Sequence, residues 1–198
     1  MIVLETIVVA FSALPMPKLE WSARNMKYSL CAFPLVGVVI GLCAWGWGKL
    51  PLPGILRGAG LCLLPVLITG GIHLDGYADT CDALASHSDA ETRQKILKDP
   101  HLGAFAAIRL CAYFVASFAL WTALKEARLP AMLGLFGLSR ALSALALTLF
   151  PIREGSGLAR SFAEAADKRR ARAILIPTAL LFTLLLTFAG GALSVLAA

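Results

Sequence analysis

Five long apolar runs constrain the fold of this chain more than any other feature. Each approaches the roughly 20 residues that an α-helix needs to cross the hydrocarbon core of a bilayer. They cover about residues 30–48, 52–72, 104–124, 129–150 and 174–197. An earlier run, residues 1–14, is shorter and carries Glu5, which favours an interfacial or re-entrant helix. The sequence therefore predicts an all-α, polytopic integral membrane protein of about five transmembrane helices, with residues 1–198 as a single transmembrane domain.

The composition agrees with a membrane protein. Apolar residues make up 59% of the chain and charged residues 15%, whereas soluble domains have about 45–50% and 25%. The five cysteines form no Cys-x-x-Cys pair, so neither a disulfide framework nor a zinc site is predicted. A net charge of +6 would suggest nucleic-acid binding in a soluble protein, but in a membrane protein it mainly sets topology. We expect no nucleic-acid partner.

The basic residues predict the orientation of the chain. Twelve of the 18 Lys and Arg residues lie in three alternate connections, on the side that holds Lys18, Arg93 and Arg153. By the positive-inside rule this side faces the cytoplasm. The two opposite connections are very short, so runs one and two, and runs three and four, are expected to form antiparallel hairpins. Gly37 and Gly41 have the spacing of a close helix contact.

Residues 73–103, in the second cytoplasmic connection, hold most of the polar chemistry. Six of the twelve acidic residues and all three histidines lie there. Asp75, Asp79 and Asp82, here called the acidic stripe, recur at i, i+4 and i+7, within about 60° of arc on one helix face. We therefore expect a cytoplasmic acidic catalytic segment in which three carboxylates point the same way.

Like charges at this spacing repel one another, so something should compensate the acidic stripe. Mg²⁺ takes oxygen ligands and is commonly held by one or two carboxylates together with substrate phosphates. The stripe therefore predicts a magnesium site, with Asp75, Asp79 and Asp82 as ligands, that presents the metal to a phosphate or diphosphate. The alternative is a solvated acidic helix face beside the membrane.

Other polar residues of this segment are predicted to have supporting roles. His73 lies about 160° from Asp75 around a helix, so we expect a proton carrier or a hydrogen-bond donor rather than a fourth ligand. Ser88 and Glu91 have capping-box spacing, which predicts Ser88 as the N-cap of a short helix and Asp89 as a helix-start residue. Lys98 is expected to meet phosphate or a lipid headgroup.

Arginines outside the segment also indicate a site. Arg140 lies in the middle of the fourth run, where a charge is costly unless an acid or a phosphate accompanies it. Arg153 and Arg160 flank a Gly-Ser-Gly segment. Arginine binds phosphate bidentately and glycine lets a backbone approach closely, so these residues are candidates for substrate binding.

Residues 70–82, GGIHLDGYADTCD, closely resemble the signature of the cobalamin-5′-phosphate synthases, also called adenosylcobinamide-GDP ribazoletransferases. The HLDG-x-AD-x-x-D pattern is quite specific. The resemblance continues in family order through residues 33–37 with Gly41, 98–105, 139–140 and 151–157. Together these segments cover most of the chain.

This resemblance implies a multi-pass enzyme of the cytoplasmic (inner) membrane, with its active site facing the cytoplasm. Such an enzyme joins adenosylcobinamide-GDP to α-ribazole 5′-phosphate, or to α-ribazole, and releases GMP, with Mg²⁺ as cofactor. Membrane lipid and a second copy of the chain are further expected partners. The interpretation of the residues and the resemblance together predict three sets of site residues. Catalytic roles fall to His73, Asp99 and Arg140, and substrate binding falls to Lys98, Arg153 and Arg160. Metal binding falls to Asp75, Asp79 and Asp82.

Two departures from the family pattern accompany this resemblance. Family members usually carry a Gly-Gly-x-Thr-Gly-Asp element near the C-terminus, which this sequence lacks before Ala198, so we expect a fragment, a shortened chain or a divergent member. Pro100-His101 stands where the family commonly has Ser-Arg. The phosphate contact that the family's arginine would make is therefore not expected in the same form at His101.

Three other functions compete with this prediction. A transferase acting on a CDP-activated alcohol also sets aspartates on membrane helices, but the spacing here and the preceding His-Leu argue against it. A cation transporter requires the acidic stripe near the bilayer midplane, whereas the stripe directly follows a full apolar run. A purely structural membrane subunit leaves the stripe and Arg140 unexplained.

Overall fold

A computed structural model describes residues 26–125, 131–151 and 158–190 of the chain. The predicted N-terminal interfacial helix and Arg153 lie outside these residues. The described part contains eight helices and no strand, which confirms the all-α prediction. The helices are α3 (Ser29–Gly48), α4 (Gly54–Thr69), α5 (Ile72–Ala85), α6 (Ala90–Ile96), α7 (Ala104–Ala123), α8 (Ala131–Leu149), α9 (Leu158–Ala165) and α10 (Lys168–Gly190).

Four of these helices are long and apolar enough to cross a membrane: α3, α7, α8 and α10. A fifth candidate exists only when α4 and α5 are taken together, as a pair bent by 93°. The second apolar run was expected to span residues 52–72, but α4 has only 16 residues. It ends early because Gly70 and Gly71 both take left-handed backbone conformations, which close a helix and are accessible to glycine. The polytopic membrane fold is therefore confirmed, with a shorter second helix.

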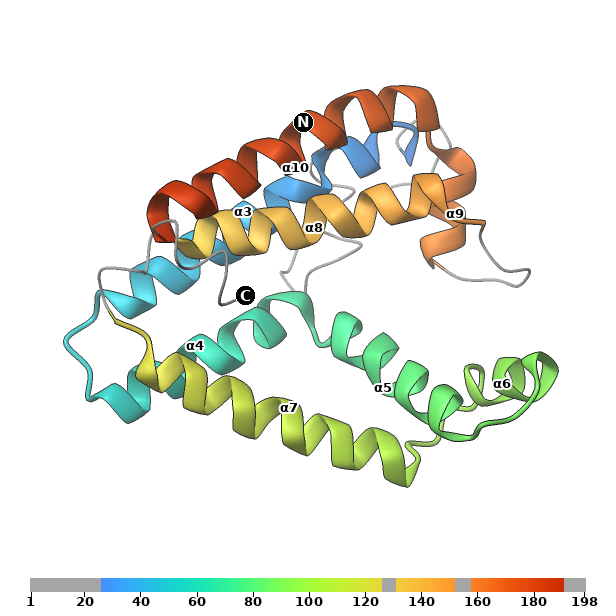
Figure 1. Cartoon of the computed structure of the whole chain (residues 1–198), viewed down its shortest axis with the longest axis horizontal. Helices are drawn as coiled ribbons and strands as arrows, with labels where there is room; N and C mark the ends of the chain where they lie inside the picture. Colours follow the sequence, from blue (N-terminus) through green and yellow to red (C-terminus); the bar gives the residue numbers. More distant parts are fainter. Residues whose placement is uncertain (1–25, 126–130, 152–157, 191–198) are drawn as a thin grey trace. The chain divides into compact units, whose positions relative to one another are not determined.

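The helices fall into two compact units, each described here by itself. The first unit contains α3, α8, α9 and α10. Its three long helices lie side by side, with α8 against both α3 and α10 (Figure 1). A Cβ at Gly37 of α3 would overlap the Phe136 carbonyl of α8 and lie 2.8 Å from Gly137 Cα. The predicted packing role of Gly37 is therefore confirmed, because only glycine lets these two backbones approach so closely.

The second unit contains α4, α5, α6 and α7. α4 runs along α7, and Gly58 of α4 faces Thr122 of α7, where a Cβ would lie 2.9 Å from Thr122 Cα. α5 leaves the Gly70-Gly71 elbow at 93° to α4 and packs on the first half of α7 (Figure 1). The acidic stripe is therefore carried by a helix that turns away from its apolar predecessor.

Each unit has one main pair of helices that are distant in sequence. Within the first unit α3 packs mainly on α8, and within the second unit α4 packs mainly on α7. The expected hairpins would each join helices of different units, so they stay predictions. The prediction of a single domain over residues 1–198 stays a prediction.

Candidate functional site

The acidic stripe lies on α5, directly after the elbow that ends α4. The amides of Leu74 and Asp75 both donate to the Gly71 carbonyl, at 2.8 and 2.9 Å, so the second left-handed glycine starts the new helix. Asp75 is exposed, whereas Asp79 and Asp82 are half-buried. The Gly-Gly dipeptide is a turn signal that marks this elbow in the sequence.

Asp82 does not point into open space with the other two carboxylates. Its Oδ2 accepts a hydrogen bond from the Gly103 amide and its Oδ1 accepts one from the Ala106 amide, both at 2.8 Å. These amides belong to the first turn of α7, where backbone N–H groups lack partners within the helix. Asp82 therefore keeps the expected spacing on α5, but its carboxylate is directed at the α7 N-terminus, which attracts a negative charge.

This arrangement limits how a metal would be held. Within the residues that the structure describes, no three His, Cys, Asp or Glu side chains lie close enough together to hold a metal ion. Asp75 and Asp79, one helical turn apart, are the two stripe carboxylates not engaged at α7. Mg²⁺ needs only one or two protein carboxylates when a substrate supplies phosphate oxygens. The pair fits that requirement.

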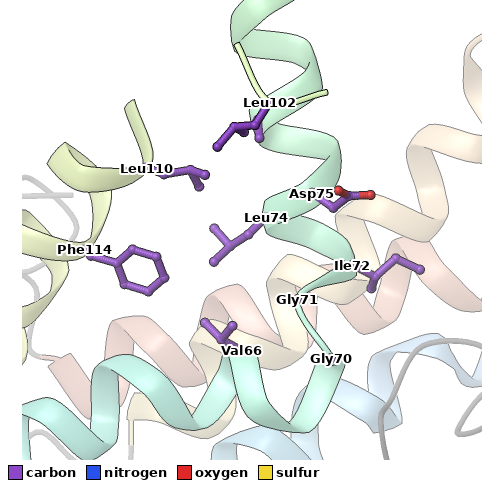
Figure 2. Close-up of a pocket in the computed structure, with 10 residues that line it drawn as sticks. Val66, Gly70, Gly71, Ile72, Leu74, Asp75, Leu102, Leu110 and Phe114 are labelled. Atoms are coloured by element: carbon purple, nitrogen blue, oxygen red, sulfur yellow. The ribbon is translucent and has the colours of Figure 1, made fainter. Parts of the chain in front are cut away.

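An apolar cavity of about 520 Å³ opens between α4, α5 and α7. Figure 2 shows Leu74 and Phe114 pointing toward one another across it, with Val66 and Leu110 beside them. Asp75 also contributes to the lining, but its carboxylate lies on the other side of α5 (Figure 2). The α5 helix therefore separates an apolar cavity from the face that carries the acidic pair.

The connection between α6 and α7 carries two further candidates. Asp99 Oδ1 accepts a hydrogen bond from the His101 amide at 3.0 Å and lies 2.6 Å from its ring Nδ1. The backbone hydrogen bond, aided by the ring, lowers the pKa of Asp99 below its ordinary value, so this carboxylate is a weaker proton acceptor than usual. Lys98 is exposed. The sequence prediction gave His101 no role, although a histidine two residues after an aspartate was a readable signal.

The start of α6 differs from the prediction by one residue. Asp89 is the N-cap, and its Oδ1 accepts from the Thr92 amide at 2.7 Å, which lowers the pKa of Asp89. Ser88 instead donates its hydroxyl to the Ser86 carbonyl. The prediction of Ser88 as N-cap is wrong because Asp89 occupies that position. The assignment of Asp89 as a helix-start residue is confirmed.

His73 and the arginine candidates lie on two different units. His73 is half-buried in the first turn of α5. In the other unit, Arg140 is buried on the packed face of α8, with 9% of its surface exposed, and its Nη1 donates to Ser139 Oγ at 3.3 Å. Arg160 of α9 pairs with Glu164 at 2.5 Å. A buried guanidinium in an apolar helix is consistent with the prediction that Arg140 marks a site, but its role stays a prediction.

Comparison with known proteins gives one consistent result. A protein of Lachnoclostridium phytofermentans named adenosylcobinamide-GDP ribazoletransferase is 43% identical over 164 residues, which is 81% of this chain and 63% of the relative. Proteins of the same name from Pseudomonas putida (strain W619) and Clostridium perfringens (strain 13) are 36% and 34% identical, over 92% and 80% of this chain and 74% and 65% of the relatives. The chain therefore spans less than two thirds of several curated relatives, including the first. No solved structure matches it.

The sequence profile of one protein family covers nearly the whole chain. It matches residues 4–198, and its description is cobalamin-5-phosphate synthase. The match includes α5 with its acidic stripe and every other described helix. By this match, the chain belongs to the cobalamin-5-phosphate synthase family.

Proposed function

We propose that this chain carries the activity after which its relatives are named, adenosylcobinamide-GDP ribazoletransferase. In this reaction a hydroxyl of α-ribazole 5′-phosphate, or of α-ribazole, attacks the phosphorus atom attached to cobinamide. A new P–O bond forms, the P–O bond to the GMP portion breaks, and the hydroxyl proton is released. The products are adenosylcobalamin 5′-phosphate, or adenosylcobalamin, and GMP.

The observation that carries the proposal is the pair Asp75 and Asp79 on α5, within the segment that resembles the family signature. These two carboxylates would hold Mg²⁺, which would supply neutralising charge at the diphosphate oxygens. The elbow at Gly70 and Gly71 turns α5 by 93° away from α4. The acidic pair therefore lies on α5, whose axis runs in a different direction from that of the apolar helix α4.

The proton of the attacking hydroxyl needs an acceptor. Asp99 and His73 are the two candidates, and the lowered pKa of Asp99 makes this carboxylate a weaker proton acceptor than an ordinary aspartate. We propose that one of these two groups accepts the proton, and the variants His73→Asn and Asp99→Asn decide between them. Substitution of the acceptor lowers kcat much more than substitution of the other residue. An unchanged kcat in both variants would contradict the proposal.

Basic residues would bind the phosphates of the two substrates. We assign this role to Lys98, Arg153 and Arg160, because arginine and lysine are the side chains that neutralise phosphate. Arg140 keeps a catalytic role, since its guanidinium would stabilise charge that develops on the diphosphate. The enzyme would lie in the cytoplasmic membrane in contact with lipid, with α5 facing the cytoplasm as the distribution of basic residues predicts. Association into a homo-oligomer is a separate hypothesis, which light scattering of the purified protein in detergent tests.

The experiment that tests the function measures GMP release by the purified chain in detergent or lipid. It supplies adenosylcobinamide-GDP and α-ribazole 5′-phosphate, with Mg²⁺ or with EDTA. The proposal predicts GMP only when both substrates and Mg²⁺ are present. GMP that does not depend on α-ribazole 5′-phosphate would indicate a hydrolase instead. A second sample, extended by the family's Gly-Gly-x-Thr-Gly-Asp segment, gives a complete test, and a folded extended protein without activity would contradict the proposal.

A further inference from the structure

The N-terminus of α7 obtains its capping group from another helix. The N-cap residue is Gly103, with φ −82° and ψ 167°, and glycine has no side chain that could accept from the first-turn amides. Asp82 of α5 accepts instead from the Gly103 and Ala106 amides. In a capping box these N-cap and N3 positions are served by two side chains. Here one carboxylate, 21 residues earlier in the chain than Gly103, serves both.

The fit at this contact leaves no room for a larger residue at position 103. A Cβ on Gly103 would lie 2.5 Å from Asp82 Oδ2 and 2.6 Å from its Cγ. Real Cβ atoms essentially never lie so close to a neighbouring heavy atom, so a side chain here would displace the carboxylate. Gly103 and Asp82 therefore form one matched contact between α5 and α7.

The contact also changes the charge balance of the acidic stripe. The N-terminus of a helix carries a partial positive charge, and both oxygens of Asp82 are directed at it. Part of the repulsion within the stripe is thus compensated by the protein itself. Asp75 and Asp79 are the carboxylates of the stripe that are not directed at the α7 N-terminus.

We propose that Asp82 is a positioning residue that clamps the start of α7 to α5, rather than a ligand of the metal. This inference rests on the proposed function. The clamp fixes the end of the connection that carries Lys98 and Asp99, because that connection enters α7 at Gly103. Leu102, the residue before the clamp, lines the cavity beside Leu74.

The test compares substitutions at Asp82 with the same chemical change one turn earlier, at Asp79. The variants are Asp82→Asn, Asp82→Ala and Asp79→Asn. One readout is hydrogen exchange of the Gly103 and Ala106 amides in the purified protein, which needs no turnover. The other is the Mg²⁺ concentration that gives half-maximal GMP release, or half of the Mg²⁺-dependent rise in melting temperature.

A clamp predicts different results for the three variants. Asp82→Ala speeds exchange of both amides by about fivefold or more, since each loses its acceptor. Asp82→Asn keeps one acceptor oxygen, and asparagine caps helices about as well as aspartate, so exchange rises less and the Mg²⁺ requirement changes by less than about threefold. Asp79→Asn leaves the amides unchanged and raises the Mg²⁺ requirement by about tenfold or more.

Two outcomes overturn the inference. The first is Asp82→Asn raising the Mg²⁺ requirement as much as Asp79→Asn does, which would make Asp82 a ligand. The second is unchanged amide exchange in Asp82→Ala, which would show that the clamp does not form. Failure of the proposed function is distinguishable, because it removes GMP release from the wild type and leaves the exchange comparison intact.

Discussion

The α3–α8 pair of the first unit and the α5–α7 pair of the second unit are held together by different chemistry. In the first unit, α3 and α8 meet through Gly37 and Gly41, whose absent side chains let the backbones touch. In the second unit, α5 meets α7 through a carboxylate that accepts two backbone hydrogen bonds. Lipid tails are as apolar as the helices they surround, so helices within a membrane associate through close packing. A polar clamp instead requires matched donors and acceptors.

The two helix pairs therefore offer different tests. The first unit buries one charged side chain among its described residues, Arg140. The second unit carries all three members of the acidic stripe, together with His73 and Asp99. Substitutions at the packing glycines of α3 should therefore act mainly on stability, and those at Asp75 and Asp79 of α5 mainly on activity.

The largest expected effect tests the chemical side of this comparison. Asp79→Ala should lower GMP release by about 100-fold or more, because the diphosphate loses several kcal/mol of charge stabilisation, while the melting temperature stays near that of the wild type. Turnover and melting are measured on the same preparation. Glu91→Ala is the matched control, since Glu91 is an exposed acid that pairs with Lys95, and its activity should change by less than about twofold. Full activity in Asp79→Ala would show that Asp79 does not take part in the reaction.

The second prediction tests the packing side. Gly37→Ala should lower the stability of the protein by about 2–3 kcal/mol, because the added methyl group overlaps the α8 backbone. The melting temperature should fall by about 5–10 °C. Gly46→Ala is the control on the same helix, because no atom lies within 4 Å of the added Cβ. A control variant that melts as low as Gly37→Ala would contradict the contact explanation, because alanine is a better helix former than glycine and meets no neighbouring atom at position 46.

The third prediction concerns a polar contact between α8 and α10 of the first unit. Arg172 of α10 donates from Nη2 to the Thr148 carbonyl and from Nε to its hydroxyl, at 3.3 Å for the latter. Arg172→Met should lower stability by about 1–2 kcal/mol and the melting temperature by a few degrees. Arg169→Met makes the same change in charge at an exposed position of α10. Equal melting temperatures for the two variants would mean that Arg172 contributes nothing through Thr148.

The smallest expected effect concerns pH. The pKa of Asp99 is lowered by its contacts with His101, so their stabilisation is present above the unfolded-state pKa of about 3.9 and is lost as the pH falls through the lower folded-state pKa. His101→Ala keeps the backbone amide and removes the ring, so the pKa of Asp99 should rise part of the way to its ordinary value. Carboxyl chemical shifts followed by NMR measure this change. The lowered pKa of Asp89, which comes from Thr92, should not move.

Several features of the site could be read from neighbouring residues in the sequence. The spacing of Asp75 and Asp79 places them one turn apart on α5, as predicted, and the helix start near Asp89 was off by one residue. The third carboxylate could not be predicted in the same way. Asp82 has the correct helical spacing, but Gly103 lies 21 positions further on. Nothing in helical periodicity indicates that the first turn of α7 packs beside it.

The amino-acid sequence is enough to predict apolar helices suited to a membrane, interrupted by one acidic segment. The length and periodicity of an apolar run depend on residues close together in the chain, so both can be read without knowledge of the tertiary packing. The packing of α3 on α8 and of α4 on α7, and the capping of α7 by Asp82, become visible only in three dimensions. These contacts join surfaces from distant parts of the chain. A single glycine without a Cβ, or a single free backbone amide, determines which helices pack together.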